Sequence, residues 1–514
     1  MKTELQDKEV LAMYDIRGIQ DYVFKTNAAK EVVGASKIVD NIILNGLKKY
    51  VSKLPKEEQE HYVTDWTEEN TEKNFVKAGS ELKMQVMFVG GGNAYVLYRT
   101  GAICSSVNRY LGKYVLESTY SLNLAVAVVE KTDSYKDDYS AINIEMRKVK
   151  AHMPLALPVG SFPFMVSDTI TGYPVSGKDE YSAGKSYLCT ESLLKRKAAT
   201  LERDPNIEKV FDNMVTEKGD NSTLALIHID GNSLGKRIMN IMSPVTGYPS
   251  AIKKMRKLSA GIDNTFKETF KEMEAFMDEE SKKLPKQGRK FRKIVLAGDD
   301  ITFVCNAKLA LPAVEFFLKK LNEKEVPFLK TEEEPNPKFS ACAGIAYFNS
   351  HFPFSDAYKV AEACCESAKD RAKEPENSNI RNGNQIVGNF IDFQMCTNVN
   401  ASDLDTYREK HYLTDGNLFI TRPYYVSVIS DNGLNEKNKK YDIEILKEKI
   451  GFLTDTGIVP RSLAKEIRNV IPQGENEILK EMSYIKSRNM DSRIDISEDT
   501  GAWYDACELM DLAL

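Results

Sequence analysis

Two adjacent aspartates, Asp299 and Asp300, lie in the stretch KIVLAGDDITFVC, between two runs of strand-forming residues. Like charges side by side are unfavourable unless bulk water or a cation stabilises them. The apolar flanks disfavour bulk water, so a bound cation is the chemistry that this pair suggests. The stretch predicts a β-hairpin with the aspartates at its turn, where Gly298 permits an unusual backbone conformation and a close approach of a ligand.

A third carboxylate follows another predicted strand. The segment STLALIHIDGNSLG reads as an apolar strand ending at Asp230, and we expect this strand to lie beside the hairpin in one sheet. Asp230 and Asp299 can then face each other across a gap that suits one or two divalent cations, and carboxylate oxygens favour Mg²⁺ or Mn²⁺ over zinc. His228 is expected on the opposite face of the strand, as a core or interface histidine.

Simpler interpretations exist for each aspartate taken alone. An Asp-Asp pair in a turn is common because aspartate favours turns and solvent. Asp230 can equally serve as a helix cap at a strand-to-helix turn. The occurrence of all three after apolar strands of one predicted unit favours the metal site.

The residues after Asp230 predict a phosphate-binding turn. They lead from the strand into a helix, so backbone N–H groups and a helix N-terminus are available to a phosphate. Lys369 on a later predicted helix can add positive charge, although exposed lysines are usually only solvated. The predicted binding residues are Gly231, Asn232, Ser233, Leu234, Gly235 and Lys236. Metal carboxylates beside a phosphate site are typical of nucleotidyl transfer.

The predicted elements occur twice in the same order, which indicates a divergent internal repeat. Strand, helix, hairpin, helix and strand are predicted from VLAMYDIRGIQDYVF onward and again from STLALIHIDGNSLG onward. In the first copy, EVVGASKIVDNIILNGLKKY is predicted as the helix and GGGN as the hairpin turn. A connector rich in Gly, Pro and Tyr separates the copies, and YDIEILKEKIGFL and PRSLAKEIRNVI predict a helical C-terminal module. We therefore expect an α+β chain divided into residues 8–135, 136–215, 216–395 and 396–514.

Composition sets the class of protein. The 514 residues are 42% hydrophobic and 28% charged, as in globular proteins of several domains, and the net charge of −5 argues against nonspecific coating of nucleic acid. Apolar runs are shorter than the roughly 18 residues of a membrane span, and no signal-peptide core is recognised, so a cytoplasmic location is expected. The eight cysteines never form C-x-x-C, which favours buried reduced thiols.

The combination of DGNSLGK with AGDD, preceded by DIRGIQDYVFKTN and GASKIVD, resembles the large polymerase-palm subunit of type III CRISPR effector complexes. The resemblance implies two ferredoxin-like palm domains, related to the nucleotide cyclases with GGDEF motifs, and synthesis of cyclic oligoadenylates from ATP with Mg²⁺ or Mn²⁺. It also implies guide RNA and CRISPR effector subunits as partners. The family's GGDD signature appears as Ala297, Gly298, Asp299 and Asp300, and Asp230 falls at the other metal carboxylate.

The first copy departs from that pattern. Its hairpin carries Gly91, Gly92 and Asn93 where an acidic pair would stand. The resemblance therefore implies that this copy holds the acceptor nucleotide while the second does the chemistry, with Asp15 as a turn residue rather than a ligand.

Two further departures concern other parts of the family. The connector resembles the family's zinc-binding insert, but Asp168 and Ser192 stand where cysteines are expected and only Cys189 remains, so no structural zinc is expected. No His-Asp dipeptide occurs among the five histidines, so an HD nuclease is not expected either.

Three functions stay open from the sequence. The leading one is an ATP-condensing synthase of a cyclic or linear oligonucleotide messenger in antiviral defence. The others are a cyclase that uses GTP or mixed nucleotides, and a scaffold that binds nucleotide or RNA without turnover. Either a monomer or a homodimer is compatible with two palms in one chain, and the synthase can be freestanding or part of an RNA-guided complex.

Overall fold

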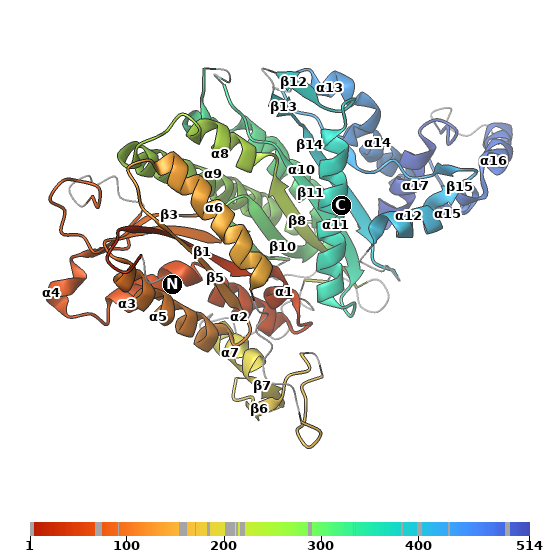
Figure 1. Cartoon of the computed structure of the whole chain (residues 1–514). Coiled ribbons are helices and arrows are strands. Elements are labelled where there is room, and N and C mark those ends of the chain that lie inside the picture. The colour runs from red at the N-terminus through yellow and green to blue at the C-terminus, as the bar shows by residue number, and fades with distance from the viewer. Residues whose placement is uncertain are drawn as a thin grey trace.

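The fold is described from a computed structural model of the chain (Figure 1). The description covers residues 5–66, 74–90, 92–153, 162–169, 171–181, 186–200, 211, 214–215, 222–285, 290–332, 334, 336–381, 384–397, 403–429, 432–488 and 494–513. The predicted α+β class is confirmed at the level of a mixed structure with several sheets and many helices.

The first sheet has five strands in the order β2-β3-β4-β1-β5. β1 lies between β4 and β5 and is antiparallel to both, while β3 and β4 form the predicted hairpin around the GGGN turn. The strands are β1 (Val10–Arg17), β2 (Tyr62–Val63), β3 (Met84–Gly90), β4 (Asn93–Tyr98) and β5 (Asn123–Glu130). The helices around them are α1 (Ile19–Phe24), α2 (Ala29–Val39), α3 (Ile42–Val51), α4 (Lys56–Gln59), α5 (Gly101–Thr119) and α6 (Tyr135–His152).

The second sheet repeats this order within a larger assembly, β17-β14-β11-β8-β10-β9. β8 lies between β10 and β11 and is antiparallel to both, and β9 and β10 form the second predicted hairpin. The strands are β8 (Thr223–Gly231), β9 (Phe291–Ala297), β10 (Asp300–Asn306), β11 (Ala341–Asn349), β14 (Asn389–Met395) and β17 (Tyr424–Val426). The helices are α8 (Leu234–Met242), α9 (Tyr248–Ser281), α10 (Ala307–Glu323) and α11 (Phe354–Lys373).

We call β1 to α6 the first repeat and β8 to α11 the second repeat. In both, alternating residues of the central strand point to opposite faces of the sheet. Leu224 and Leu226 of β8 are buried with residues of α11, whereas Ala225 and Ile227 pack with α9 and α10. The last helix of each repeat, α6 or α11, therefore lies on the face opposite to α5 or α10. Figure 1 shows α11 lying across the second sheet.

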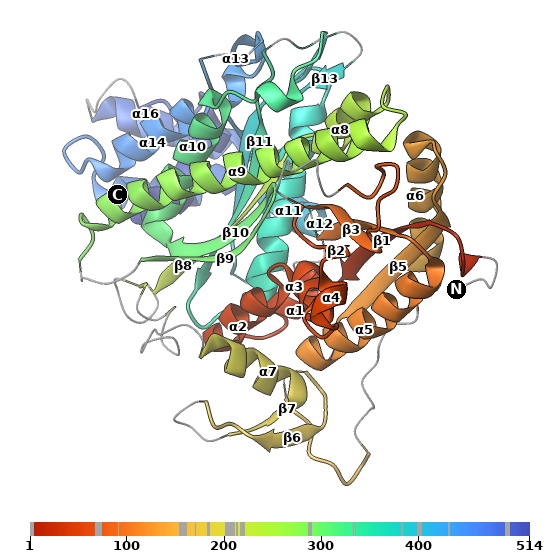
Figure 2. The same cartoon turned by 90° about the vertical axis from the view of Figure 1, so that its left-hand side faces the viewer.

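The two repeats pack against each other reciprocally. Arg256 of α9 donates hydrogen bonds to the carbonyls of Val86 and Met87 in β3, at 2.8 and 2.7 Å, beside a bulge in that strand. In the other direction, the Ser36 hydroxyl of α2 donates to the carbonyl of Ile294 in β9. A helix between the central strand and the hairpin of each repeat, α2 or α9, thus bonds to the first hairpin strand of the other repeat, and α9 is seen beside the first sheet in Figure 2.

One predicted helix is two. The segment expected as a single helix after Glu31 breaks between α2 and α3, where Asn41 adopts a left-handed conformation with φ of 54°. Asparagine tolerates this conformation better than most residues, so it permits a change of direction between the helices. The break was not predicted, because the hydrophobic pattern of the sequence continues across it.

The connector forms a small hairpin and a helix. β6 (Val175–Lys178) pairs with β7 (Tyr187–Cys189), and α7 (Thr190–Ala199) follows directly and packs against α2 of the first repeat. α6, which begins at Tyr135, lies against β5 and belongs structurally with the first sheet. The 8–135 and 136–215 boundaries stay predictions.

The C-terminal segment is helical, as predicted, but it also contributes β17 to the second sheet. Its helices are α12 (Leu404–Tyr412), α13 (Leu434–Lys437), α14 (Ile443–Thr454), α15 (Arg461–Val470), α16 (Glu475–Ser487) and α17 (Thr500–Leu509). This segment also contains a short hairpin of β15 (Leu413–Thr414) with β16 (Asn417–Leu418), and another, of β12 (Asn379–Arg381) with β13 (Asn384–Ile386), precedes β14.

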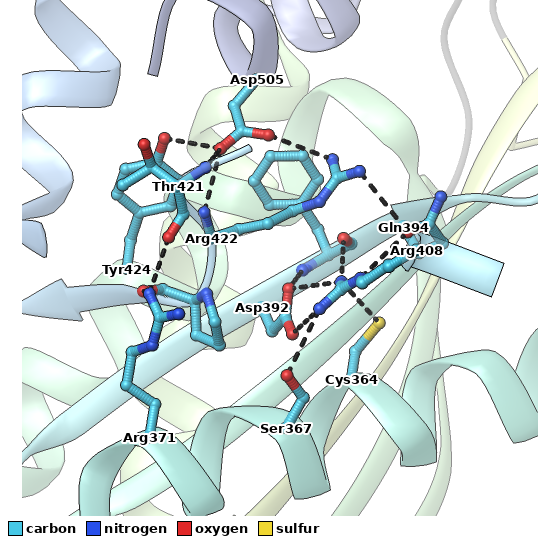
Figure 3. A network of polar contacts seen from close by, with 12 residues as sticks. Cys364, Ser367, Arg371, Asp392, Gln394, Arg408, Thr421, Arg422, Tyr424 and Asp505 are labelled. Atoms are coloured by element: carbon cyan, nitrogen blue, oxygen red, sulfur yellow. Dashed lines mark hydrogen bonds and ion pairs between the residues drawn. The ribbon is translucent and has the colours of Figure 1, made fainter. Parts of the chain in front are cut away.

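A buried ionic network joins this segment to β14 (Figure 3). Arg408 of α12 donates two hydrogen bonds, both 2.8 Å, to the two carboxylate oxygens of the fully buried Asp392. Arg422 lies 3.4 Å from Asp505 of α17 and donates to Glu508 at 2.6 Å. Such charges are tolerated in the interior only because each is paired.

α11 lies very close to β11 at Gly344, and this contact gives a stability test. A Cβ at this position would overlap the carbonyl oxygen of Ala361 and the amide nitrogen of Cys365, both backbone atoms of α11. We expect Gly344→Ala to lower the free energy of unfolding by about 3 kcal/mol, because helix and strand must separate to admit the methyl group. Urea unfolding followed by circular dichroism measures this.

Gly112 provides the matched control. It lies within α5, and a Cβ there would meet open space. Gly112→Ala should stabilise the protein by up to about 1 kcal/mol, because alanine is the better helix former. Equal effects of the two substitutions would contradict the tight α11–β11 contact.

Candidate active site

The three predicted carboxylates come together at one end of the second sheet. Ile229 of β8 pairs with Ile301 of β10, so the antiparallel register sets Asp230 opposite Asp300. A Cβ on Gly231 would lie 3.0 Å from the Cβ of Asp299 and 3.1 Å from its Oδ2. The absence of a side chain at Gly231 therefore lets Asp299 lie directly against the end of β8.

The hairpin turn that carries the pair consists of Gly298 and Asp299, and Asp300 is the first residue of β10. Gly298 has a φ of +66°. Only glycine adopts this conformation without strain, which explains the residue type at the turn. The role that the sequence predicted for Gly298, an unusual backbone at the turn, is confirmed.

Lys369 of α11 brings a positive charge to these carboxylates. Its Nζ donates a hydrogen bond of 2.5 Å to Asp230 Oδ2 and another of 3.2 Å to Glu366. Burial alone would lower the pKa of Lys369, but the hydrogen bond to Asp230 raises it above its ordinary value. The lysine is therefore a permanent cation beside Asp230.

The other two carboxylates hold their protons more tightly than free aspartate does. Burial, followed by the charge of Asp230, raises the pKa of Asp299 to about 6. Burial, Asp230 and then Asp299 raise the pKa of Asp300 to about 7. Lys369 thus compensates only part of the negative charge, and the remainder is unfavourable in the protein alone.

Asp300 has one hydrogen-bonded oxygen and one orphaned oxygen. Its Oδ2 accepts a hydrogen bond of 3.3 Å from Nε2 of Gln20, a residue of α1 in the first repeat. Its Oδ1 is buried and lacks a hydrogen-bond partner among the described residues. The nearest cationic candidate is Nδ1 of His228, at 3.6 Å, which exceeds hydrogen-bond distance.

The predicted orientation of His228 is wrong. His228 and Asp230 are two residues apart in β8 and therefore share a face of the sheet. His228 is buried on this face, and its Nδ1 lies 3.2 Å from Oγ1 of Thr302. Burial lowers the pKa of His228 to about 4, so the imidazole is neutral at physiological pH.

The donor atoms are of the type that a hard divalent cation prefers. Three carboxylates are present. Two of them, Asp299 and Asp300, have raised pKa values, and one oxygen of Asp300 is buried without a hydrogen-bond partner among the described residues. Within the part of the chain that the structure describes, no three His, Cys, Asp or Glu side chains are already grouped to hold a metal ion. Asp230 is instead paired with Lys369, so a cation held by all three carboxylates would compete with this ion pair.

The predicted phosphate turn divides into anchors and exposed residues. The backbone N–H of Asn232 donates to the carbonyl of Ser340 at 2.9 Å, and its side-chain amide donates to Gly388 O at 3.0 Å. Leu234 is buried in the core, whereas Ser233, Gly235 and Lys236 are exposed. The exposed residues at the start of α8 are the ones available to a phosphate, while Asn232 and Leu234 fix the turn.

The first repeat contains a related arrangement that is less acidic. Asp15 pairs with Asn93 across β1 and β4, and Lys150 of α6 donates to the Asp15 carboxylate. Asp15 therefore lies within the strand, at the position equivalent to Asp230, rather than in the predicted turn. Gly92 and Asn93 stand where Asp299 and Asp300 stand in the second repeat, and Gly91 lies outside the described residues. Lys150 was not identified from the sequence.

The three connector positions compared with zinc ligands are linked by hydrogen bonds. The Cys189 thiol accepts from Thr171 Oγ1 at 3.3 Å, and Thr171 N donates to Asp168 at 2.8 Å. Ser192 donates from its hydroxyl to the buried Glu31 of α2 at 3.1 Å. The absence of zinc stays a prediction.

All eight cysteines are buried and free, as predicted. Among the described helices none is long and apolar enough to cross a membrane.

The site lies inside the segment that a family model recognises. Residues 223–378 match the model described as Cas10/Cmr2, second palm domain. The match spans less than a third of the chain and includes Asp230, Asp299, Asp300 and Lys369. The resemblance drawn from the motifs is confirmed for this segment. No curated protein matches the chain.

Several solved structures are distantly similar over the whole chain. They include Csm1–Csm4 cassettes in complex with cA4, with pppApA and with one ATP. Sequence identities are 11%, 11% and 12%, TM-scores are 0.48, 0.46 and 0.45, and each alignment covers 99% of this chain and 70% of the matched chain. Similarity at this level supports no inference about function.

The raised pKa of Asp300 predicts a pH-dependent stability difference. The folded pKa lies above the unfolded value of roughly 3.9, so folding becomes less favourable as the pH rises from about 4 to about 7. Asp300→Asn removes this loss. We expect it to raise the free energy of unfolding at pH 8 by about 1 kcal/mol, a reduced figure because the side chain is 33% exposed.

Urea unfolding in EDTA at pH 8 and pH 4 measures the difference, which should vanish at pH 4. The same change at the exposed Asp278 of α9 should have little effect at either pH. An Asp300→Asn variant that is less stable than the wild type at pH 8 would contradict the repulsion between the carboxylates.

Proposed function

We propose that this protein is a metal-dependent nucleotidyltransferase that condenses ATP into a cyclic or linear oligonucleotide messenger. The observation that carries the proposal is the convergence of Asp230, Asp299 and Asp300 at one sheet end, inside the segment that matches the Cas10/Cmr2 second palm model. A structural role alone gives no reason to gather three carboxylates that repel one another.

The proposal includes the architecture implied by the family. The strand order β3-β4-β1-β5 and its repetition as β9-β10-β8-β11 support two ferredoxin-like palm domains. The second palm is the catalytic one. The first palm holds the acceptor nucleotide with Gly92 and Asn93, and this assignment agrees with its uncharged hairpin turn.

Asp230, Asp299 and Asp300 would hold the two divalent cations, Mg²⁺ or Mn²⁺. Cations bound there supply charge for the α-phosphate and pyrophosphate and lower the pKa of an attacking ribose hydroxyl. Lys369 would exchange Asp230 for a phosphate oxygen. Its ammonium group already lies at the end of β8 where the triphosphate would bind. Lys236, exposed in the first turn of α8, can contact the same triphosphate.

The proposed partners follow from the same assignment. ATP is the substrate, and guide RNA with CRISPR effector subunits is the setting in which a palm subunit of this family would act in antiviral defence. Base selection is left to experiment, so the assay must include every nucleoside triphosphate.

The proposal is tested by incubating purified protein with each labelled NTP and Mg²⁺ or Mn²⁺, followed by mass analysis of the products. We expect an ATP-derived oligonucleotide. Asp299→Ala with Asp300→Ala should reduce its formation at least 10³-fold, or about 4 kcal/mol of transition-state stabilisation, because the cation site is lost.

The control is a second adjacent acidic pair, Asp278 and Glu279, which is exposed on α9. Alanine at both of these positions should leave the yield unchanged. Equal product from the Asp299 and Asp300 double variant would overturn the proposal. Absence of product from the wild type, with candidate RNAs and partner subunits also added, would favour a nucleotide-binding scaffold.

A further inference from the structure

The first repeat contributes a side chain to the carboxylate site of the second. α1 is a six-residue helix that follows β1 directly, and its Gln20 is the donor to Asp300 Oδ2. Gln20 and Asp300 are 280 residues apart in the sequence. The contact forms because the end of β1 in the first repeat packs beside the start of β10 in the second repeat.

α1 is fixed in place from two sides. The ring of Phe24 stacks on Tyr358 of α11, with 3.9 Å between centroids and 10° between planes. The buried Lys195 of α7 donates a hydrogen bond of 2.7 Å to the carbonyl of Tyr22, and its Nζ lies 4.0 Å from the centre of the Tyr22 ring. One contact comes from the second repeat and the other from the connector, so α1 has little freedom to withdraw Gln20.

The two oxygens of Asp300 are therefore unequal. The Gln20 amide occupies Oδ2, while Oδ1 is buried and unpartnered among the described residues, with His228 Nδ1 at 3.6 Å. A donor on one carboxylate oxygen sets the rotation of the group and leaves the other oxygen for a cation.

We propose that Gln20 is a positioning residue that orients Asp300 for cation binding, so that the cation site is shared by both repeats. The inference rests on the proposed function. It assigns to the first repeat a part in the catalytic centre of the second, in addition to any nucleotide that the first repeat holds.

The test is the Mn²⁺ dissociation constant of the full chain without nucleotide, measured by electron paramagnetic resonance. Gln20→Met keeps the length of the side chain and removes the amide donor. We expect it to weaken Mn²⁺ binding about tenfold, the effect typical of losing a partner of a metal ligand. The KM for Mg²⁺ in the product assay should rise, while kcat at saturating Mg²⁺ stays within about twofold.

Two further variants complete the test. Gln59→Met changes a glutamine of α4 whose side-chain amide donates a hydrogen bond of 2.9 Å to the nearby carbonyl of Leu54, and this variant should bind Mn²⁺ as the wild type does. Gln20→Asn keeps an amide on a shorter side chain and should also weaken Mn²⁺ binding, which keeps the test available if Gln20→Met does not fold.

The possible outcomes separate this inference from the proposed function. If the wild type forms product and Gln20→Met binds Mn²⁺ with an unchanged constant, the inference fails and the proposed function stands. If the wild type neither binds Mn²⁺ nor forms product, both fail. Weaker Mn²⁺ binding by Gln20→Met, with Gln59→Met unchanged, supports the inference.

Discussion

Three carboxylates at the end of two neighbouring strands are the constraint on which the site depends. The sheet register places Asp230 beside Asp300, and the missing side chain at Gly231 leaves room for Asp299. The backbone therefore holds the three carboxylates close together. Among the described residues the ammonium group of Lys369 offsets part of this repulsion, and burial together with the remaining repulsion raises the pKa values of Asp299 and Asp300. A local conflict of this kind, in an otherwise consistent fold, is typical of functional sites.

The first repeat shows what the same scaffold does with fewer charges. Asp15 and Lys150 form an ion pair equivalent to that of Asp230 and Lys369, also between the central strand and the last helix of the repeat. With Asn93 at the position of Asp300, one lysine balances one carboxylate. The ion pair between the central strand and the last helix is therefore a feature of the repeat, and the hairpin of the second repeat adds two carboxylates that the first hairpin lacks.

Much of this fold was predictable because its signals are local. Alternating apolar residues and glycine-containing turns identified both hairpins and both central strands, and the aspartates are adjacent to those turns. The break at Asn41 and the joining of β17 to the second sheet were not predictable, because tertiary contacts decide them. For the site, Asp230, Asp299 and Asp300 followed from the sequence, whereas Gln20 did not, since its contact with Asp300 depends on how the two repeats face each other.

The position of Lys369 also depends on the C-terminal segment. α11 carries Lys369 toward Asp230, and neighbouring residues of the same helix contact the segment: Ser367 accepts a hydrogen bond from Arg408 at 3.3 Å, and Arg371 donates to the carbonyl of Thr421 at 2.8 Å. These contacts belong to the buried network that contains Asp392 (Figure 3).

Breaking one partner of a buried ion pair is strongly destabilising, because it leaves an uncompensated charge in the interior. The network of Arg408 and Asp392 therefore holds α12 to β14 in one arrangement, and α11 lies against both. The α11 residues held by this segment, Ser367 and Arg371, thus lie two residues before and after Lys369, which bonds to Asp230. The charge balance of the site consequently depends on the fold as a whole, from α1 of the first repeat to α12 of the C-terminal segment.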